Sequence, residues 1–200
     1  MSEKLFKNDI LFLQRLLAVA GFYRGSLNGK WSNDVDAAEA AFLAKYEEIK
    51  NQMGEFDNRT ELCIMTLSPM TQSKAREFMN AVKDRSLTYR IISGTRTYAE
   101  QDALFKKKPK VTNARGGQSN HNFGIAWDVG IFEKGKYYEG NTKKEDKAYV
   151  ELGALIKTKV SDVEWGGDWK SFVDKPHYQL ATGKSVAQVR ALLEKGKSYV

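Results

Sequence analysis

The stretch that decides the fold is residues 119–128, which read SNHNFGIAWD. From Gly124 onward, the large apolar Ile125 and Trp127 alternate with the small Ala126 and the acidic Asp128. Alternation with a period of two indicates a β-strand that buries one face and leaves the other open. The open face therefore carries one carboxylate among small neighbours, which leaves room for an ion and a bound molecule.

His121 precedes Asp128 by seven residues. On one flat strand an odd separation would place the two side chains on opposite faces. They can converge only if the chain turns between them, and Gly124 is the residue that permits such a turn. The alternative is a surface loop that leads into a strand with an ordinary aspartate.

The second of the two histidines, His177, follows Pro176, which favours an extended approach for Lys175. Two histidines and one aspartate leave the fourth position of a tetrahedral zinc ion open for water, as in catalytic zinc sites. Asp174 stands close to His177 on a different azimuth, which suits a group that handles protons. The alternative for His177 and Asp174 is a surface pair with structural hydrogen bonds.

Around these segments, periodicity predicts helices and strands in mixed order. The expected strands are 87–93, 123–132 and 163–165, and the expected helices are 68–82, 97–105 and 144–158. This order predicts an α+β domain with a small antiparallel sheet.

The first fifty residues have a different pattern. Apolar residues recur at helical spacing over 10–20 before Gly21, and a second helix is expected over 34–49 with Ser32 or Asn33 as its cap. The polar segment 54–60 lacks periodicity, so we expect an all-helical domain over 1–53 and a second domain over 54–200.

The net charge of +7 favours an anionic partner such as nucleic acid, a membrane surface or a cell-wall polymer. No nucleic-acid recognition module is evident. The N-terminal segment resembles neither a signal peptide nor a membrane span. The single cysteine, Cys63, excludes an intramolecular disulfide and is expected to be buried.

The run from Ser119 to Asp128, followed by Asp174-x-Pro176-His177, resembles the VanY/VanX-type zinc peptidases of the M15 family. It is most similar to the L-alanyl-D-glutamate peptidases of phage endolysins. The resemblance implies that His121, Asp128 and His177 bind one zinc ion per chain, and that Asp174 is the catalytic base.

The segment from Ile92 to Gln101 is similar to the substrate segment of that family. The resemblance implies that Arg96 contacts the substrate and helps to orient or polarise it, whereas the sequence alone favours a surface ion-pair residue. Gln101 and Ser119 are expected to bind substrate as well. Their alternative roles are a helix cap for Gln101 and a loop support for Ser119.

The motif Leu13-Gln14-x-Leu16-Leu17, with Gly21 and Asn28-Gly29, resembles small helical peptidoglycan-binding domains. Those domains usually have Asp-Gly where this chain has Asn28-Gly29. A helical appendage with only a structural role is the alternative.

Together these features predict a monomeric zinc endopeptidase that hydrolyses the L-Ala–D-Glu bond of peptidoglycan stem peptides. As an endolysin, it would stay in the cytoplasm of an infected bacterium until lysis and then act on the cell wall. One alternative is a D-Ala-D-Ala carboxypeptidase or dipeptidase with the same zinc site. Another is a cell-wall-binding protein without catalysis.

Overall fold

The computed structural model describes residues 3–200, with side chains from residue 7 onward, and divides into two compact units. Unit 1 contains the chain up to Glu48 together with Thr95–Gly124 and Thr182–Val200, and unit 2 contains Ile49–Gly94 and Ile125–Ala181. The domain boundary expected after residue 53 stays a prediction, and residues 1–2 lie outside the described part. Within residues 3–200, no helix combines the length and apolar character needed to cross a membrane.

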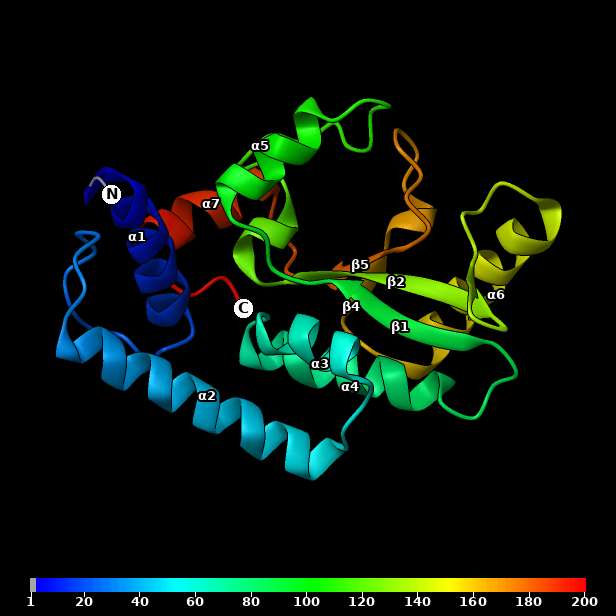
Figure 1. The fold of residues 1–200 in the computed structure, drawn as a ribbon, viewed down its shortest axis with the longest axis horizontal. Coiled ribbons are helices and arrows are strands. Elements are labelled where there is room, and N and C mark those ends of the chain that lie inside the picture. Colours follow the sequence, from blue (N-terminus) through cyan, green and yellow to red (C-terminus); the bar gives the residue numbers. More distant parts are fainter. Residues whose placement is uncertain (1–2) are drawn as a thin grey trace. The chain divides into compact units, whose positions relative to one another are not determined.

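Unit 2 is built around a five-stranded sheet whose strands all pair antiparallel (Figure 1). The strands follow the order β1-β2-β5-β4, and β3 pairs with β2. Their bounds are Thr88–Ser93 for β1, Ala126–Glu133 for β2, Lys136–Tyr137 for β3, Val163–Trp165 for β4 and His177–Leu180 for β5. The predicted α+β class with a small antiparallel sheet is confirmed.

Helices pack against the sheet of unit 2 and bury one of its faces. These helices are α3 (Asn58–Met65), α4 (Pro69–Val82) and α6 (Lys143–Lys159). Phe78 of α4 lies edge-on to Trp127 and Tyr178, with ring centroids 6.3 and 4.7 Å away. All three side chains are fully buried. The residues that flank Asp128 and His177 along their strands therefore form the core.

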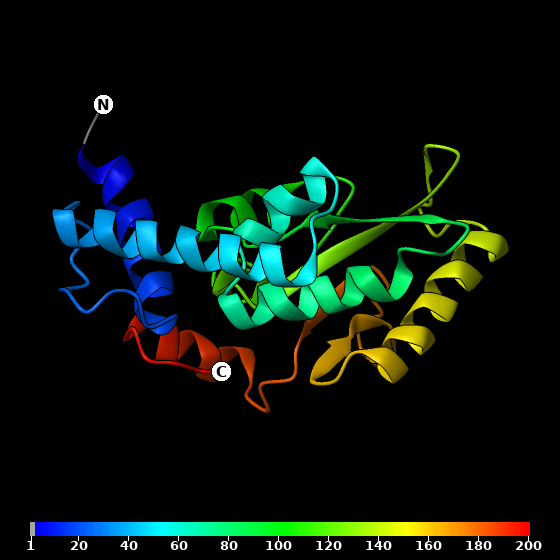
Figure 2. The same ribbon diagram turned by 90° about the horizontal axis from the view of Figure 1, so that it is seen from below.

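Unit 1 consists of helices and turns. Its elements are α1 (Glu3–Val19), most of α2 (Asn33–Met53), α5 (Tyr98–Lys106), a short 3₁₀ helix η1 (Asn120–Phe123) and α7 (Val186–Glu194). Figures 1 and 2 show α1 beside α7. Leu17, Tyr23, Val35 and Ala38 form a buried cluster.

Gln14, which belongs to the N-terminal motif, is fully buried and anchors the loop that follows α1. Its Oε1 accepts hydrogen bonds from the backbone amides of Asn28 and Gly29 at 3.0 and 2.9 Å. Its Nε2 donates to the carbonyl of Lys30 at 2.8 Å. Gly29 has a φ of +70°, a conformation that favours glycine or asparagine. Asn28-Gly29 thus forms the expected turn, and the buried side chain of Gln14 holds it in place.

Several expected elements are observed with small shifts of their ends. The helices expected over 68–82, 97–105 and 144–158 correspond to α4, α5 and α6, and the first and third expected strands correspond to β1 and β4. The helix expected over 34–49 continues to Met53. Residue 123 was expected to start a strand, but it ends η1, because the chain turns at Gly124 before β2 begins.

Other features were not expected from the sequence. The helices α3 and α7 were not predicted, nor was β5 as a strand. The expectation that Cys63 is buried is wrong, since it is partly exposed on α3.

A buried ion pair links α3 to α4. Both guanidinium ends of Arg76 contact the Glu61 carboxylate, at 2.8 and 2.7 Å, and Nη1 also donates to the carbonyl of Gly54 at 2.6 Å. Glu61 in turn accepts a bond from the backbone amide of Phe56 at 2.8 Å. Since Arg76 is fully buried, the Glu61 carboxylate balances its charge inside the protein.

We predict that Glu61→Ala lowers the free energy of unfolding by about 3–5 kcal/mol, because it leaves a buried guanidinium without its carboxylate. Urea denaturation followed by circular dichroism measures this change. Glu151→Ala is the control, since it removes an exposed i,i+4 pair with Lys147 and should change little. Equal stability of the two variants would contradict the assigned role.

Candidate metal centre

The pairing of β2 with β5 places Asp128 directly opposite His177. Residues opposite each other in an antiparallel pair point to the same face. The distance from His177 Nδ1 to Asp128 Oδ1 is 3.4 Å. Trp127 precedes Asp128 on β2 and Tyr178 follows His177 on β5, and their rings stack on the other face of the sheet. The sheet therefore holds these two side chains together on its polar face.

His121 reaches the same place from η1, just before the strand. The Ser119 hydroxyl accepts a hydrogen bond from the His121 backbone amide and caps η1. Gly124 follows with a φ of +69°, so the predicted turn between His121 and Asp128 is present. The C-terminal segment supports this turn, since the Tyr199 hydroxyl donates to the carbonyl of Phe123.

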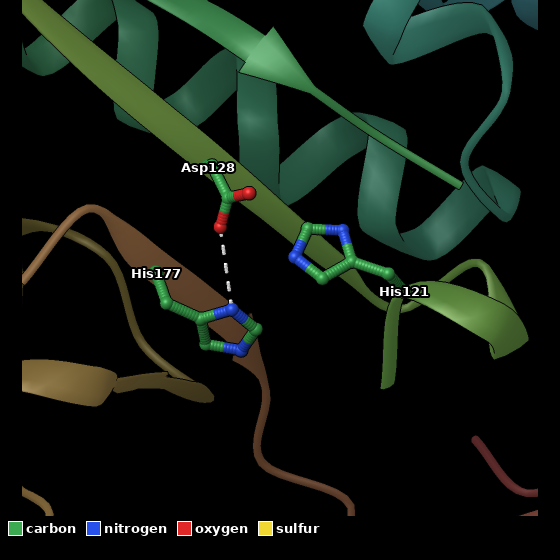
Figure 3. A group of neighbouring side chains, drawn as sticks. All are labelled: His121, Asp128 and His177. Carbon is green, nitrogen blue, oxygen red and sulfur yellow. Dashed lines mark ion pairs between the residues drawn. The ribbon is translucent and has the colours of Figure 1, made fainter. Parts of the chain in front are cut away.

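One atom from each of His121, Asp128 and His177 forms a group in which all separations are within 4.8 Å. Figure 3 shows the carboxylate and both imidazole rings directed into one common space. Two atoms that bind one tetrahedral zinc at 2.0–2.1 Å stand about 3.3 Å apart. The 3.4 Å between His177 and Asp128 matches this spacing. The donor set and its spacing fit a metal ion.

Both imidazoles are buried, with residue exposures of 2% for His121 and 5% for His177. Burial lowers the pKa of His177, but the hydrogen bond and charge of Asp128 outweigh it, so the pKa is raised above its ordinary value. Hydrogen bonding to Gln179 and the charge of Asp174 act in the same direction. The raised pKa thus reports the negative charge that Asp128 and Asp174 place around this ring.

Asp174 lies in the loop before β5 and is partly exposed. Its carbonyl accepts a hydrogen bond from the backbone amide of His177 at 3.2 Å, and its own amide donates to the carbonyl of Gly166 at 3.0 Å. A Cβ atom on Gly166 would lie 2.4 Å from the Asp174 carbonyl oxygen. The close approach to a glycine therefore fixes the Asp174 backbone beside His177.

Arg96 is tied to the His121 turn through its backbone. Its amide donates to the carbonyl of His121 at 3.0 Å, and its carbonyl accepts from the Asn122 side chain at 2.9 Å. Arg96 Nη1 also donates to Gln101 Oε1 at 3.4 Å. These backbone contacts hold Arg96 next to the turn that carries His121.

The other two expected substrate residues make internal contacts. Gln101 is fully buried, and its amide nitrogen donates to the carbonyl of Ala114 at 3.0 Å. Gln101 therefore supports the guanidinium of Arg96, and Ser119 caps η1. Direct contact of either residue with a substrate stays a prediction.

The sequence reasoning overlooked several residues around His177. Gln179 Oε1 lies 3.0 Å from His177 Nε2, and Glu164 accepts a hydrogen bond from Gln179 Nε2 at 2.7 Å. The Trp169 ring is tilted against the His177 ring at a centroid distance of 4.9 Å. Gln179 could have been found, because it lies two residues beyond His177 and hence on the same strand face.

Comparison with known proteins finds peptidases similar to this chain. A family model of the M15 peptidases, described as D-alanyl-D-alanine carboxypeptidase, matches residues 112–180. The chain is 34% identical over 125 residues to the peptidoglycan L-alanyl-D-glutamate endopeptidase CwlK of Bacillus subtilis, which covers 57% of this chain and 73% of that protein.

The chain is also similar to a phage protein and to a protein of known structure. The chain is 30% identical over 114 residues to the L-alanyl-D-glutamate peptidase of Listeria phage A118, covering 57% of this chain but only 38% of that protein. The crystal structure of the Serratia marcescens L-Ala D-Glu endopeptidase ChiX matches with a TM-score of 0.48 and 25% identity. That match covers 62% of this chain and 88% of the other.

We predict that the chain binds one divalent metal ion and that Asp128→Ala weakens this binding by more than about 100-fold. The estimate follows because losing even a hydrogen-bond partner of a metal ligand costs about 10- to 100-fold. Competition with a chromophoric chelator measures the affinity. The exposed Asp84→Ala is the control, and equal affinity of both variants would exclude Asp128 as a ligand.

Proposed function

The chain belongs to the M15 peptidase family, L-alanyl-D-glutamate type, and we propose that it is a zinc-dependent endopeptidase of peptidoglycan. The bond it cuts is that between L-Ala and D-Glu in the stem peptide. The names of the similar proteins from Bacillus subtilis and Listeria phage A118 support this choice.

The observation that carries the proposal is the group of His121, Asp128 and His177, with Asp174 near enough for its charge to act on His177. A bound zinc ion supplies a Lewis acid that polarises the scissile carbonyl and makes the attacking water more acidic. His121, Asp128 and His177 would hold the ion, and three protein ligands would leave one position of a tetrahedral site for the reacting groups.

Asp174 and Arg96 have separate roles in the proposed reaction. Asp174 takes a proton from the attacking water and gives it to the leaving amine, which is the usual function of a general base beside a metal site. Arg96 orients the peptide, since a planar guanidinium presents several donors to a carboxylate or carbonyl oxygen. Gln101 limits the movement of Arg96 through the contact at 3.4 Å.

The N-terminal helices α1 and α2 are proposed to bind the cell wall. The support is the motif around Gln14 and its anchored Asn28-Gly29 loop, together with a net charge of +7 that attracts anionic wall polymers. Lysis of a bacterial host, with a cytoplasmic location before lysis and the wall as the site of action, belongs to the same proposal. So does a monomeric state.

We predict that the protein, incubated with purified peptidoglycan, releases fragments with a new N-terminal D-Glu. A chelator abolishes this release and added zinc restores it, because the water and carbonyl lose their Lewis acid. Mass spectrometry of the digest identifies the new ends. Release of D-Ala instead would favour the carboxypeptidase activity in the description of the matching family model, and no cleavage with zinc present would refute the enzyme.

We also predict that Asp174→Ala lowers kcat by about 10²- to 10⁴-fold while zinc affinity is unchanged, since a general base contributes about that factor. Turnover of a stem-peptide substrate and chelator competition give the two values. Asp168→Ala is the matched control, because that exposed carboxylate pairs with Lys157 instead. Full activity of Asp174→Ala would remove this residue from the mechanism.

A further inference from the structure

The His177 ring has polar neighbours on both of its nitrogens. Nδ1 faces Asp128 at 3.4 Å, and Nε2 faces the Gln179 side chain at 3.0 Å. A neutral imidazole carries its proton on one nitrogen and a lone pair on the other. Because Nδ1 is the nitrogen on the side of the other two ligands, it must hold the lone pair if the ring binds a metal ion there.

The orientation of the Gln179 amide follows from Glu164. These two residues are paired across β4 and β5, and Gln179 Nε2 donates to Glu164 Oε2 at 2.7 Å. An ionised carboxylate only accepts hydrogen bonds, so it must face the NH₂ group of the amide. The oxygen of Gln179 is then left to face His177 Nε2, where it can only accept.

The polar face of the sheet is shaped for this contact. His177 and Gln179 are two residues apart on β5 and share a face. The residue opposite Gln179 on β2 is Ala126, and the residue opposite His177 is Asp128. A methyl group beside Gln179 leaves the amide space to lie along the strand towards the ring.

Two acceptors therefore compete for the ring proton of neutral His177. Asp128 would draw it to Nδ1, which would block that nitrogen as a ligand. Gln179 would hold it on Nε2, which would leave Nδ1 free. Hydrogen bonds from the other nitrogen of a metal-binding histidine commonly fix its tautomer and orientation in this way.

We infer that Gln179, oriented by Glu164, is a positioning residue that keeps the His177 proton on Nε2 and so directs Nδ1 towards the metal ion. This inference rests on the proposed zinc site. It assigns a role in metal binding to β4, which supplies none of the three ligands.

The test compares the wild type with Gln179→Leu, which keeps similar volume but has no acceptor. We expect the zinc affinity of the variant, from chelator competition, to fall by about 10- to 100-fold. In the metal-free protein, long-range proton–nitrogen correlation spectra at a pH above the titration of both histidines report the proton position. The chain has only two histidines, and we expect the His177 proton to move from Nε2 towards Nδ1 in the variant.

An exchange of the two groups separates positioning from simple packing. In the double variant Gln179→Glu with Glu164→Gln, the carboxylate faces His177 and the amide donates to it. We expect this exchange to restore both the proton on Nε2 and most of the zinc affinity. If the double variant stays as weak as Gln179→Leu, the contact is only structural and the inference fails.

Should Gln179→Leu fail to fold, Glu164→Ala replaces it, because Glu164 is exposed. We expect a smaller loss of zinc affinity and the same direction of proton movement, with Glu151→Ala as the control for removal of an exposed carboxylate. An unchanged zinc affinity and an unchanged proton position in Glu164→Ala would overturn the inference. The proposed function would stand in that case if the wild type binds zinc and cleaves peptidoglycan. A wild type that binds no zinc would refute the proposed function instead, and the proton position alone would then decide the role of Gln179.

Discussion

The antiparallel register between β2 and β5 is the constraint on which the rest of the site depends. It places Asp128 opposite His177, and it places Trp127 opposite Tyr178. A slip of one residue in either strand would move every side chain of that strand to the other face. A ligand would then enter the core and an aromatic ring would enter the polar face. Burial of the aromatic pair therefore enforces the pairing of the two ligands.

The third ligand has a different kind of support, which lies in the turn that precedes β2. The left-handed conformation at Gly124 ends η1 and lets the chain change direction within three residues of His121. The backbone of η1 is held by Ser119, by the amide of Arg96 and by the Tyr199 hydroxyl. Through its bond to the carbonyl of Phe123, Tyr199 helps to hold the turn that presents the proposed ligand His121.

The sequence was sufficient to predict the features that depend on local pattern. Alternation over 125–129 gave the strand and its two faces, and helical spacing gave α4, α5 and α6. The short element α3 lacked a pattern, because its eight residues begin with a polar turn capped by Asp57. For β5, Pro176 indicates only an extended approach to His177, and the pairing of this strand with β2 and β4 is long-range. The contact between Gln179 and Glu164 depends on strand pairing across 15 residues, which no local pattern encodes.

The two faces of the central strands also explain how a small sheet can hold reactive groups in place. The proposed ligands Asp128 and His177 point away from the core, but their neighbours Trp127 and Tyr178 are fully buried and pack against Phe78. Interiors are close-packed, so the backbone at these neighbours has little freedom to shift. Since Asp128 lies between the buried Trp127 and Val129, and His177 directly precedes the buried Tyr178, core packing sets the positions of both Cα atoms. Folding of the core therefore orders these two side chains, and an ion bound at the proposed site would meet them already at the required spacing.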